Sequence, residues 1–303
     1  MKGVALLIEE DVLKACRIAA ELRRKVSRTI HPGKPIILVC EEIEDEIRRL
    51  GGQPAFPCNV GINEVAAHYT SDINDAGKIP WDGVVKIDFG VHVNGYIADT
   101  AFTIALSPRY QTLVRAVEDA LEAALDSLKP GVKAGEVGAA IERTIKSWGY
   151  KPIRNLMGHK MERFILHAGK SIPNVSALDG THILEGELYA VEPFLTTMNG
   201  EGSVVELDKG FIYRLHREKG VKDRYAKELI KRIRERFYTL PFTIRWLKDE
   251  IDNPGFTNTF KQLLDNGNIK VYPILVEKRG EPVAQAEHTV LITHNGCKIL
   301  TEL

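Results

Sequence analysis

The sequence predicts an α+β fold in which antiparallel sheets are flanked by helices. Long segments with helical periodicity are grouped in the first half of the 303-residue chain, and short apolar runs with strand character follow them. Because helices and strands do not alternate one for one, regular βαβ units are not expected. A basic segment with helical periodicity lies among the late strands and predicts an insertion within a single domain of residues 1–303.

Two amphipathic helices are predicted at the start of the chain. Apolar residues recur on one side of residues 9–30 and again on one side of residues 35–50. A proline–glycine pair ends the first helix and a glycine pair ends the second. Residues 54–68 are expected to be extended or looped with a short helix at their end, and residues 70–83 to form a polar surface loop.

Residues 84–104 predict a β-hairpin. Two apolar runs flank Asn94-Gly95, a dipeptide that strongly favours a two-residue hairpin turn. With that turn, Asp88 lies opposite Ala101, and Asp99 is two residues from Ala101 on the same strand. Side chains alternate between the faces of a strand, so both aspartates project from one face as diagonal neighbours, about 7–8 Å apart. Two carboxylates among apolar residues are costly to bury without a positive partner, so the hairpin is a candidate metal site.

The elements after the hairpin are two helices and several short strands. Helical periodicity covers residues 108–128, which end before a proline–glycine pair, and residues 134–148. Apolar strand-like runs then cover residues 187–195, 271–276 and 284–293.

The insertion is predicted at approximately residues 210–258. Apolar residues recur every fourth position from Val221 to Phe237, which indicates one apolar helix face. Residues 214–236 hold ten Lys/Arg against four Asp/Glu, so the rest of this helix is basic.

The bulk composition excludes several classes of protein. Lys+Arg 41 and Asp+Glu 41 give no net charge, so chain-wide attraction to polyanions is not expected. The four cysteines are scattered without a C-x-x-C pair, which argues against a zinc ribbon or a dense disulfide framework. The sequence shows neither a signal-peptide pattern nor a run of about 20 apolar residues. We therefore expect a soluble cytoplasmic protein.

Acidic and histidine residues recur in apolar surroundings beyond the hairpin. They are Glu192 in ELYAVEPFL, Glu287 in PVAQAEHTVLIT, His159 in NLMGHKMER, His167 in FILHAGKSIP and His68 in NEVAAHYT. Any one of them alone is more often a structural residue. Four acids in apolar strand-like runs are a different matter, because unpaired buried charges cost several kcal/mol each. A divalent metal would neutralise them, and oxygen ligands with imidazole suit manganese, iron, cobalt or zinc.

The words around these residues resemble the methionine aminopeptidases and their wider "pita-bread" metallopeptidase superfamily. The matching words are NEVAAHYT, KIDFGVHVNGYIADTAFT, KPIRNLMGH, LHAGKSIPN, YAVEPF and AEHTV. The order of the family's five metal ligands is matched by Asp88, Asp99, His159, Glu192 and Glu287. The long insert with its YTLPFTIRWL stretch resembles the type 2 subfamily. The start at the first core helix resembles the archaeal form.

The resemblance implies a pita-bread fold, one catalytic domain and removal of the initiator methionine from nascent proteins. Asp99 and Glu287 would bridge two divalent ions, Asp88 would complete one site, and His159 with Glu192 the other. Such a centre activates water for attack on the first peptide carbonyl. Glu192 would also carry the proton of that water. Cobalt, manganese, iron and zinc all suit these ligands.

The resemblance also implies a substrate site. His68 and His167 match the family's two active-site histidines that are not ligands. His68 would stabilise charge at the scissile amide, and His167 would contact the substrate backbone. Phe56, Leu166 and Ile212 would line the methionine side-chain pocket, although a plain core role for Phe56 stays open. A tight second subsite implies a preference for a small second residue.

Two alternative functions stay open at this point. One is a proline-specific peptidase of the same fold, against which the type 2 insert argues. The other is a non-catalytic relative that binds RNA or protein, against which the complete ligand set argues. Nascent polypeptide N-termini are the expected partners of a monomer, with no membrane and no sequence-specific nucleic acid. The basic insertion is either a solvated helix face or a contact with the ribosome or its RNA.

Overall fold

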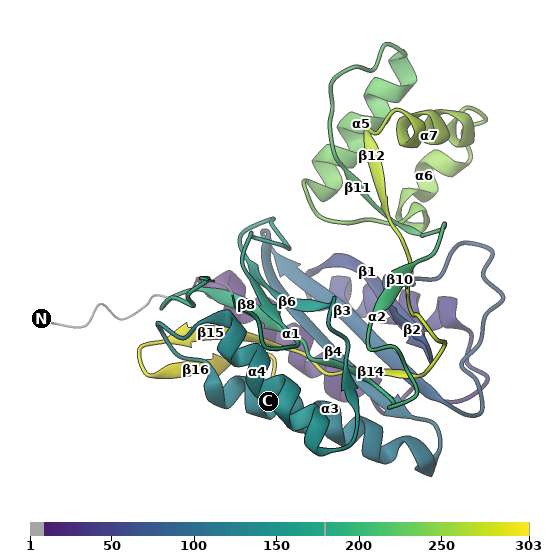
Figure 1. Cartoon of the computed structure of the whole chain (residues 1–303). Helices are drawn as coiled ribbons and strands as arrows, with labels where there is room; N and C mark the ends of the chain where they lie inside the picture. Colours follow the sequence, from purple (N-terminus) through teal and green to yellow (C-terminus); the bar gives the residue numbers. More distant parts are fainter. Residues whose placement is uncertain (1–8, 179, 303) are drawn as a thin grey trace, which may run out of the picture.

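The computed structural model describes residues 9–178 and 180–302. Strands run between two pairs of helices, with one pair at the front of the view and the other behind the strands (Figure 1). The helices of the main body are α1 (Glu10–Val26), α2 (Ile36–Arg49), α3 (Gln111–Ser127) and α4 (Ala134–Ser147), with a short 3-10 turn η1 (Pro108–Tyr110) before α3. These positions confirm the four predicted helices. No helix in the described part of the chain is long and apolar enough to cross a membrane.

Across residues 9–178 and 180–302, the strands form five antiparallel sheets. Their strand orders are β1-β3-β4, β10-β13-β2, β11-β12, β14-β9-β5 and β16-β15-β8-β6-β7. The strands of the first half are β1 (Gln53–Ile62), β2 (Val65–Ala67), β3 (Val84–Val93), β4 (Tyr96–Ala105), β5 (Lys151–Pro152), β6 (Met157–Met161), β7 (Ser171–Pro173) and β8 (Leu188–Val191). The later strands are β9 (Phe194–Thr196), β10 (Val204–Glu206), β11 (Ile212–Leu215), β12 (Ile269–Tyr272), β13 (Leu275–Glu277), β14 (Val283–Gln285), β15 (His288–Thr293) and β16 (Gly296–Ile299).

The β3–β4 hairpin has the predicted register. Val93 pairs with Tyr96 across the Asn94-Gly95 turn, and Asp88 pairs with Ala101. Ile87 and Phe89 point into the apolar core formed with α1 and α2. Since side chains alternate along a strand, Asp88 and Asp99 project from the opposite face.

Two predictions for the segment between α2 and β3 need correction. The prediction of a short helix near residue 68 is wrong. Val65–Ala67 form the strand β2, which pairs with β13, and the preceding strand β1 pairs with β3. Residues 70–83 contain no regular helix or strand, as predicted. However, Thr70 and Ser71 are fully buried, so this loop is only partly a surface loop.

The late strands are interrupted at informative places. The predicted strand 187–195 is divided into β8 and β9 by Glu192-Pro193, and the predicted strand 284–293 is divided into β14 and β15 by Ala286-Glu287. Val191 pairs with His288 between β8 and β15. Glu192 follows Val191 and Glu287 precedes His288, so the pairing of Val191 with His288 brings the two acids close together.

The insertion is a separate helical unit on a two-stranded stalk of β11 and β12, and it projects from the main body (Figure 1). It contains α5 (Arg224–Phe237), the 3-10 turn η2 (Ile244–Leu247), α6 (Lys248–Ile251) and α7 (Phe256–Asp265). Asp223 caps α5 by accepting a hydrogen bond from the backbone N–H of Ala226. The apolar core of this unit runs from Tyr213 to Ile269 and so continues beyond the expected limit at about residue 258.

Candidate metal centre

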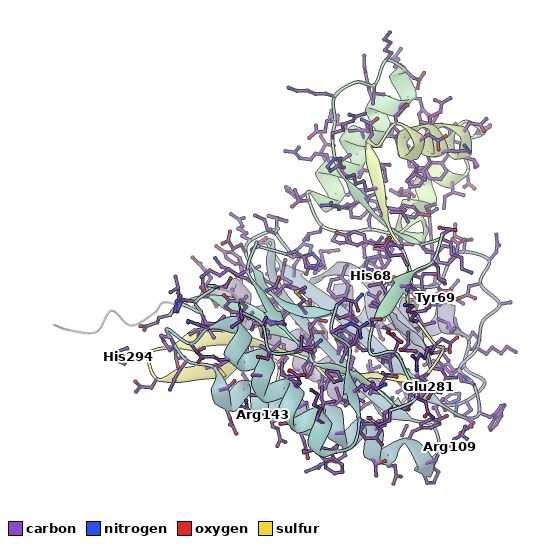
Figure 2. All side chains as sticks on the ribbon, in the orientation of Figure 1. His68, Tyr69, Arg109, Arg143, Glu281 and His294 are labelled. Carbon is purple, nitrogen blue, oxygen red and sulfur yellow. The ribbon has the colours of Figure 1, made fainter. Side chains whose placement is uncertain are left out.

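A cavity of about 210 Å³ lies where the hairpin, β6 and the two strand interruptions meet. His68, which lines this cavity, lies close to the base of the insertion (Figure 2). All of the residues predicted for ligation, catalysis or substrate binding line this one cavity. They are Phe56, His68, Asp88, Asp99, His159, Leu166, His167, Glu192, Ile212 and Glu287.

Three of the five predicted ligands lie close enough together that they could hold one metal ion. One ligand atom from each of Asp99, His159 and Glu287 lies within 4.8 Å of the others. His159 Nε2 is 3.7 Å from Asp99 Oδ2 and 3.5 Å from Glu192 Oε1. Asp88 reaches the same cavity from the neighbouring strand.

Burial holds these groups away from their usual charge states. It raises the pKa of Asp88 to about 7. The pKa values of Asp99, Glu192 and Glu287 are raised well above the usual range, first by burial and then by the neighbouring carboxylates. Burial also lowers the pKa of His159 to about 3, so its imidazole is neutral near pH 7. Four acids that repel one another and one neutral imidazole form a site prepared for cations.

The polar atoms present fit a divalent metal. Asp88 Oδ1, Asp99 Oδ1 and Glu287 Oε2 are buried and have no hydrogen-bond partner among the described residues. A buried oxygen without a partner costs free energy, and metal coordination would remove that cost. Carboxylate oxygens with one imidazole nitrogen suit manganese, iron, cobalt or zinc.

Hydrogen bonds from Thr289 and Arg23 hold the backbone that carries the ligands Asp99 and Glu287 in place. Thr289 Oγ1 accepts a hydrogen bond from Asp99 N and donates one to Asp99 O, both at 2.7 Å. Arg23 Nη1 donates to Ala101 O at 2.5 Å and to Glu287 O at 3.1 Å. Glu287 N–H also donates to Ala101 O at 2.9 Å, which joins β4 to the start of β15. These contacts keep two ligands from different strands in one geometry.

Gly158 permits the close approach of the histidine ligand. A Cβ at this position would lie 2.5 Å from Ala190 O on β8. No side chain fits in that space, so only glycine lets β6 lie this close to β8. The following residue, His159, pairs with Ala190 and is thereby placed beside Glu192.

His68 and His167 both line the cavity that contains the predicted ligands. His68 Nδ1 is 3.1 Å from Pro273 O, so it must be the protonated nitrogen, and Nε2 is then an acceptor. Burial lowers the pKa of His68 to about 4. His167 lies with its ring centroid 4.3 Å from that of His159, and its pKa is lowered by burial and by Arg214.

The apolar end of the cavity contains Phe56, which is both core and cavity wall. It packs in an apolar cluster with Ile97 and Met161, and partly buried Leu166 joins them. A Cβ at residue 90 would lie 2.4 Å from the Phe56 ring, so Gly90 makes room for this aromatic wall. Phe56 is therefore a buried core residue that also lines the cavity, and its place in a methionine pocket stays a prediction.

The cavity includes residues that the sequence analysis did not identify. They are Asn59, Ala67, Asn155, Leu156, Met157, Phe194, Pro241 and Tyr272. Asn59 pairs with Asp88 across β1 and β3. This neighbour of a predicted ligand could not be identified from the sequence, because residues 54–68 were predicted only as extended or looped. Gln285 Nε2 donates a hydrogen bond to Glu192 Oε2 at 3.3 Å. Gln285 precedes Glu287 by two residues, and this spacing was the sequence signal that could have placed it near the ligands.

Comparison with known proteins identifies the family of the chain. The model of metallopeptidase family M24 matches residues 10–294. The methionine aminopeptidase of Methanocaldococcus jannaschii is 44% identical, over 97% of this chain and 98% of the relative. The methionine aminopeptidase of Methanothermobacter thermautotrophicus is 41% identical, over 97% of this chain and 98% of the relative. That of Saccharolobus solfataricus is 44% identical over 96% and 97%.

Solved structures show the same fold at lower identity. A thermophilic Arx1 superimposes with a TM-score of 0.82 at 19% identity, covering 98% of this chain and 92% of that one. Methionine aminopeptidase from Thermotoga maritima gives a TM-score of 0.70 at 23% identity, covering 99% and 100%. A prolidase from Pyrococcus furiosus gives 0.62 at 20% identity, with 97% of this chain and 63% of that one covered. The predicted pita-bread fold and the predicted resemblance are confirmed, and the chain belongs to metallopeptidase family M24 and, within it, to the methionine aminopeptidases.

Proposed function

We propose that this chain removes the N-terminal methionine of newly made proteins and peptides by metal-dependent hydrolysis. The observation that carries the proposal is one cavity that is lined both by a group of candidate metal ligands and by apolar side chains. A peptide N-terminus fits such a site with its backbone at the ligands and its first side chain in the apolar end.

The metal site consists of the five predicted ligands. Asp99, His159 and Glu287 would hold divalent metal, and Asp88 and Glu192, which line the same cavity, would complete the site. Divalent ions held there would polarise the scissile carbonyl and acidify the attacking water.

Glu192 is the residue best placed to move the proton. Its carboxylate is buried, its pKa is raised, and its Oε2 is held by Gln285. Once metal binding has removed its own proton, this carboxylate would take a proton from the attacking water and return it to the leaving amine. His68 presents Nε2 as an acceptor to the scissile amide N–H, and His167 contacts the substrate backbone.

The side-chain pocket is formed by Phe56, Leu166 and Ile212. A flexible, polarizable thioether packs well against such aromatic and aliphatic surfaces. We infer a preference for small second residues from the family, because the subsite after the cleaved bond is tight in its members.

The experiment that tests this function begins with protein stripped of metal. It is then reconstituted with cobalt, manganese, iron or zinc in turn and incubated with Met-Ala-Ser, Ala-Ala-Ser and an X-Pro peptide. We expect release of methionine alone, with at least one ion. Cleavage of the X-Pro peptide alone would identify a proline-specific peptidase, and no hydrolysis with any ion would identify a binding protein.

The insertion supports a weaker proposal about partners. Its helix α5 is basic, but Arg232, Arg234 and Lys231 already face Glu250, Glu218 and Glu235 within the insertion. These ion pairs favour a solvated helix face, whereas the charge excess favours contact with the ribosome in the cytoplasm. Contact through Lys and Arg weakens steeply with salt, so co-sedimentation with ribosomes at low and high salt distinguishes the two.

A further inference from the structure

One segment of the insertion reaches back into the substrate cavity. Residues 238–245, which we call the strap, follow α5 and include the first two residues of the turn η2. Leu240 is buried in the same apolar cluster as Phe56. The next residue, Pro241, lines the cavity itself. The insertion therefore supplies part of the wall against which the substrate side chain would pack.

The first end of the strap is fastened to the tip of the β3–β4 hairpin. The ring of Tyr238 stacks on that of Phe164, with centroids 4.1 Å apart and planes 27° from parallel. Thr239 Oγ1 donates to Phe164 O. Phe164 N–H in turn donates to Gly95 O at 2.8 Å. This chain of contacts joins the insertion to the hairpin that carries two ligands.

Both stacked residues have unusual backbones. Tyr238 has φ 54° and Phe164 has φ 58°, a region that bulky side chains rarely adopt. Such backbones persist when surrounding contacts hold them, and they concentrate at ligand-binding sites. The stack and the hydrogen bond of Thr239 are the contacts that hold them here.

The second end of the strap is fastened to α2. Arg245 donates to both carboxylate oxygens of Glu44, at 2.8 and 2.9 Å, and both side chains are 2% exposed. Glu44 also accepts a hydrogen bond from Cys58 N, two residues from Phe56. The strap is thus tied at one end to Phe164 beside the hairpin turn, and at the other end, through Glu44, to β1, the strand that carries Phe56.

We propose that the strap sets the width of the side-chain pocket, with Tyr238 and Arg245 as positioning residues at its two ends. This inference rests on the proposed function, because the pocket is assigned to methionine there. Between the two ends, Phe242 exchanges two 2.7 Å backbone hydrogen bonds with Tyr213, next to Ile212. Loosening one end lets Leu240 and Pro241 move away from the facing wall, and the pocket then holds methionine less well and larger side chains better.

Tyr238 is the residue to test, because it is half exposed and its replacement does not open the core. Tyr238→Gly removes the ring and suits the positive φ, so the variant folds. We expect its KM for Met-Ala-Ser to rise by about 5- to 20-fold with kcat within about twofold, since an apolar pocket acts mainly through binding. The preference for Met-Ala-Ser over Phe-Ala-Ser falls by a similar factor.

Two matched variants accompany this measurement. Tyr238→Phe keeps the ring and restores the wild-type KM. Trp81→Ala removes an aromatic ring that is 80% exposed and beside Asp82, away from the strap, and leaves KM unchanged. A KM and a selectivity of Tyr238→Gly equal to those of the wild type would overturn the proposal while leaving the proposed function intact.

Hydrogen exchange gives a second readout that needs no substrate. The amides of Phe164 and Phe242 are held by the contacts described above, so both exchange faster in Tyr238→Gly, whereas those of α1 do not. Unchanged exchange at both amides would also overturn the proposal. If the wild-type chain released no methionine, the proposed function would fail, and exchange would still decide whether Tyr238 holds the strap.

Discussion

At the scale of single residues, the decisive feature is that each acid in the cavity keeps its proton more firmly than an exposed acid. Burial contributes most to this, and the neighbouring carboxylates add to it for Asp99, Glu192 and Glu287. In the metal-free protein, these buried acidic groups therefore lower the free energy of unfolding, and metal binding removes that loss. The same groups that bind the ion also destabilise the fold without it.

Replacing the carboxylate of Asp99 tests whether the same group both binds metal and destabilises the metal-free fold. Asp99→Asn abolishes methionine release, by at least about 10³-fold, because a central ligand is lost. The metal-free variant is more stable than the wild type by about 1–3 kcal/mol, since an amide needs no proton to be neutral. Urea unfolding at pH 7.5 with a chelator measures this difference. Asp208→Asn, at an exposed position, serves as the control and changes neither quantity.

Metal binding should release protons in an identifiable way. At pH 6.5 the carboxyl groups with raised pKa hold protons that they must lose to bind an ion, so affinity increases as the pH rises toward 7 and beyond. His159 contributes no proton, because its pKa of about 3 leaves it neutral already. Titration calorimetry in buffers of different ionisation enthalpy should show release of at least about one proton per chain. Binding heats that do not depend on the buffer would contradict this.

At the scale of elements, the hairpin could be predicted in full and the late strands only in part. The turn dipeptide and the period-two alternation fix the β3–β4 register from local sequence. Pro193 is a local signal for the break after Glu192, because proline has no N–H to donate within a sheet. No local signal gave the pairing that brings Glu192 beside Glu287. That pairing depends on contacts between segments about a hundred residues apart, so the common cavity of the ligands was implied by family resemblance rather than by local pattern.

The hairpin turn itself makes a quantitative prediction. Gly95 has φ 89°, and a Cβ there would lie 2.3 Å from the Phe164 ring. Gly95→Ala should cost about 2–4 kcal/mol, because strain and steric overlap add. Gly33 has φ 83° with open space around it, so Gly33→Ala should cost only about 1 kcal/mol. Equal losses in urea unfolding would show that Phe164 is not packed against the turn.

At the scale of the whole molecule, the insertion and the main body are joined by a buried ion pair. Helical periodicity predicted the insertion, but not that Arg245 would enter the main body and meet Glu44. Ser71 O and Thr70 Oγ1 also accept hydrogen bonds from this guanidinium, which explains why part of the loop before β3 is buried. Sequence pattern alone does not distinguish such an arginine from its exposed neighbours.

Breaking this pair should destabilise the molecule more than removing it. Arg245→Met leaves the Glu44 charge buried and unpaired, and should cost about 3–5 kcal/mol. Glu44→Gln combined with Arg245→Met should cost less than the sum of the two single changes, because no lone charge remains. Thermal unfolding of the two single variants and the double variant gives the coupling. Additive losses would mean that the two side chains act independently.

The stalk of the insertion has an evolutionary consequence. Ile212 pairs with Tyr272, so the chain leaves the main body and returns to it at neighbouring points. A unit attached in this way can be exchanged without rerouting any other strand, provided that the incoming unit also supplies a partner for buried Glu44. The metal ligands lie outside it, whereas Pro241 and the strap lie within it. Swapping this module between homologues would therefore transplant substrate selectivity while the hydrolytic machinery stayed behind.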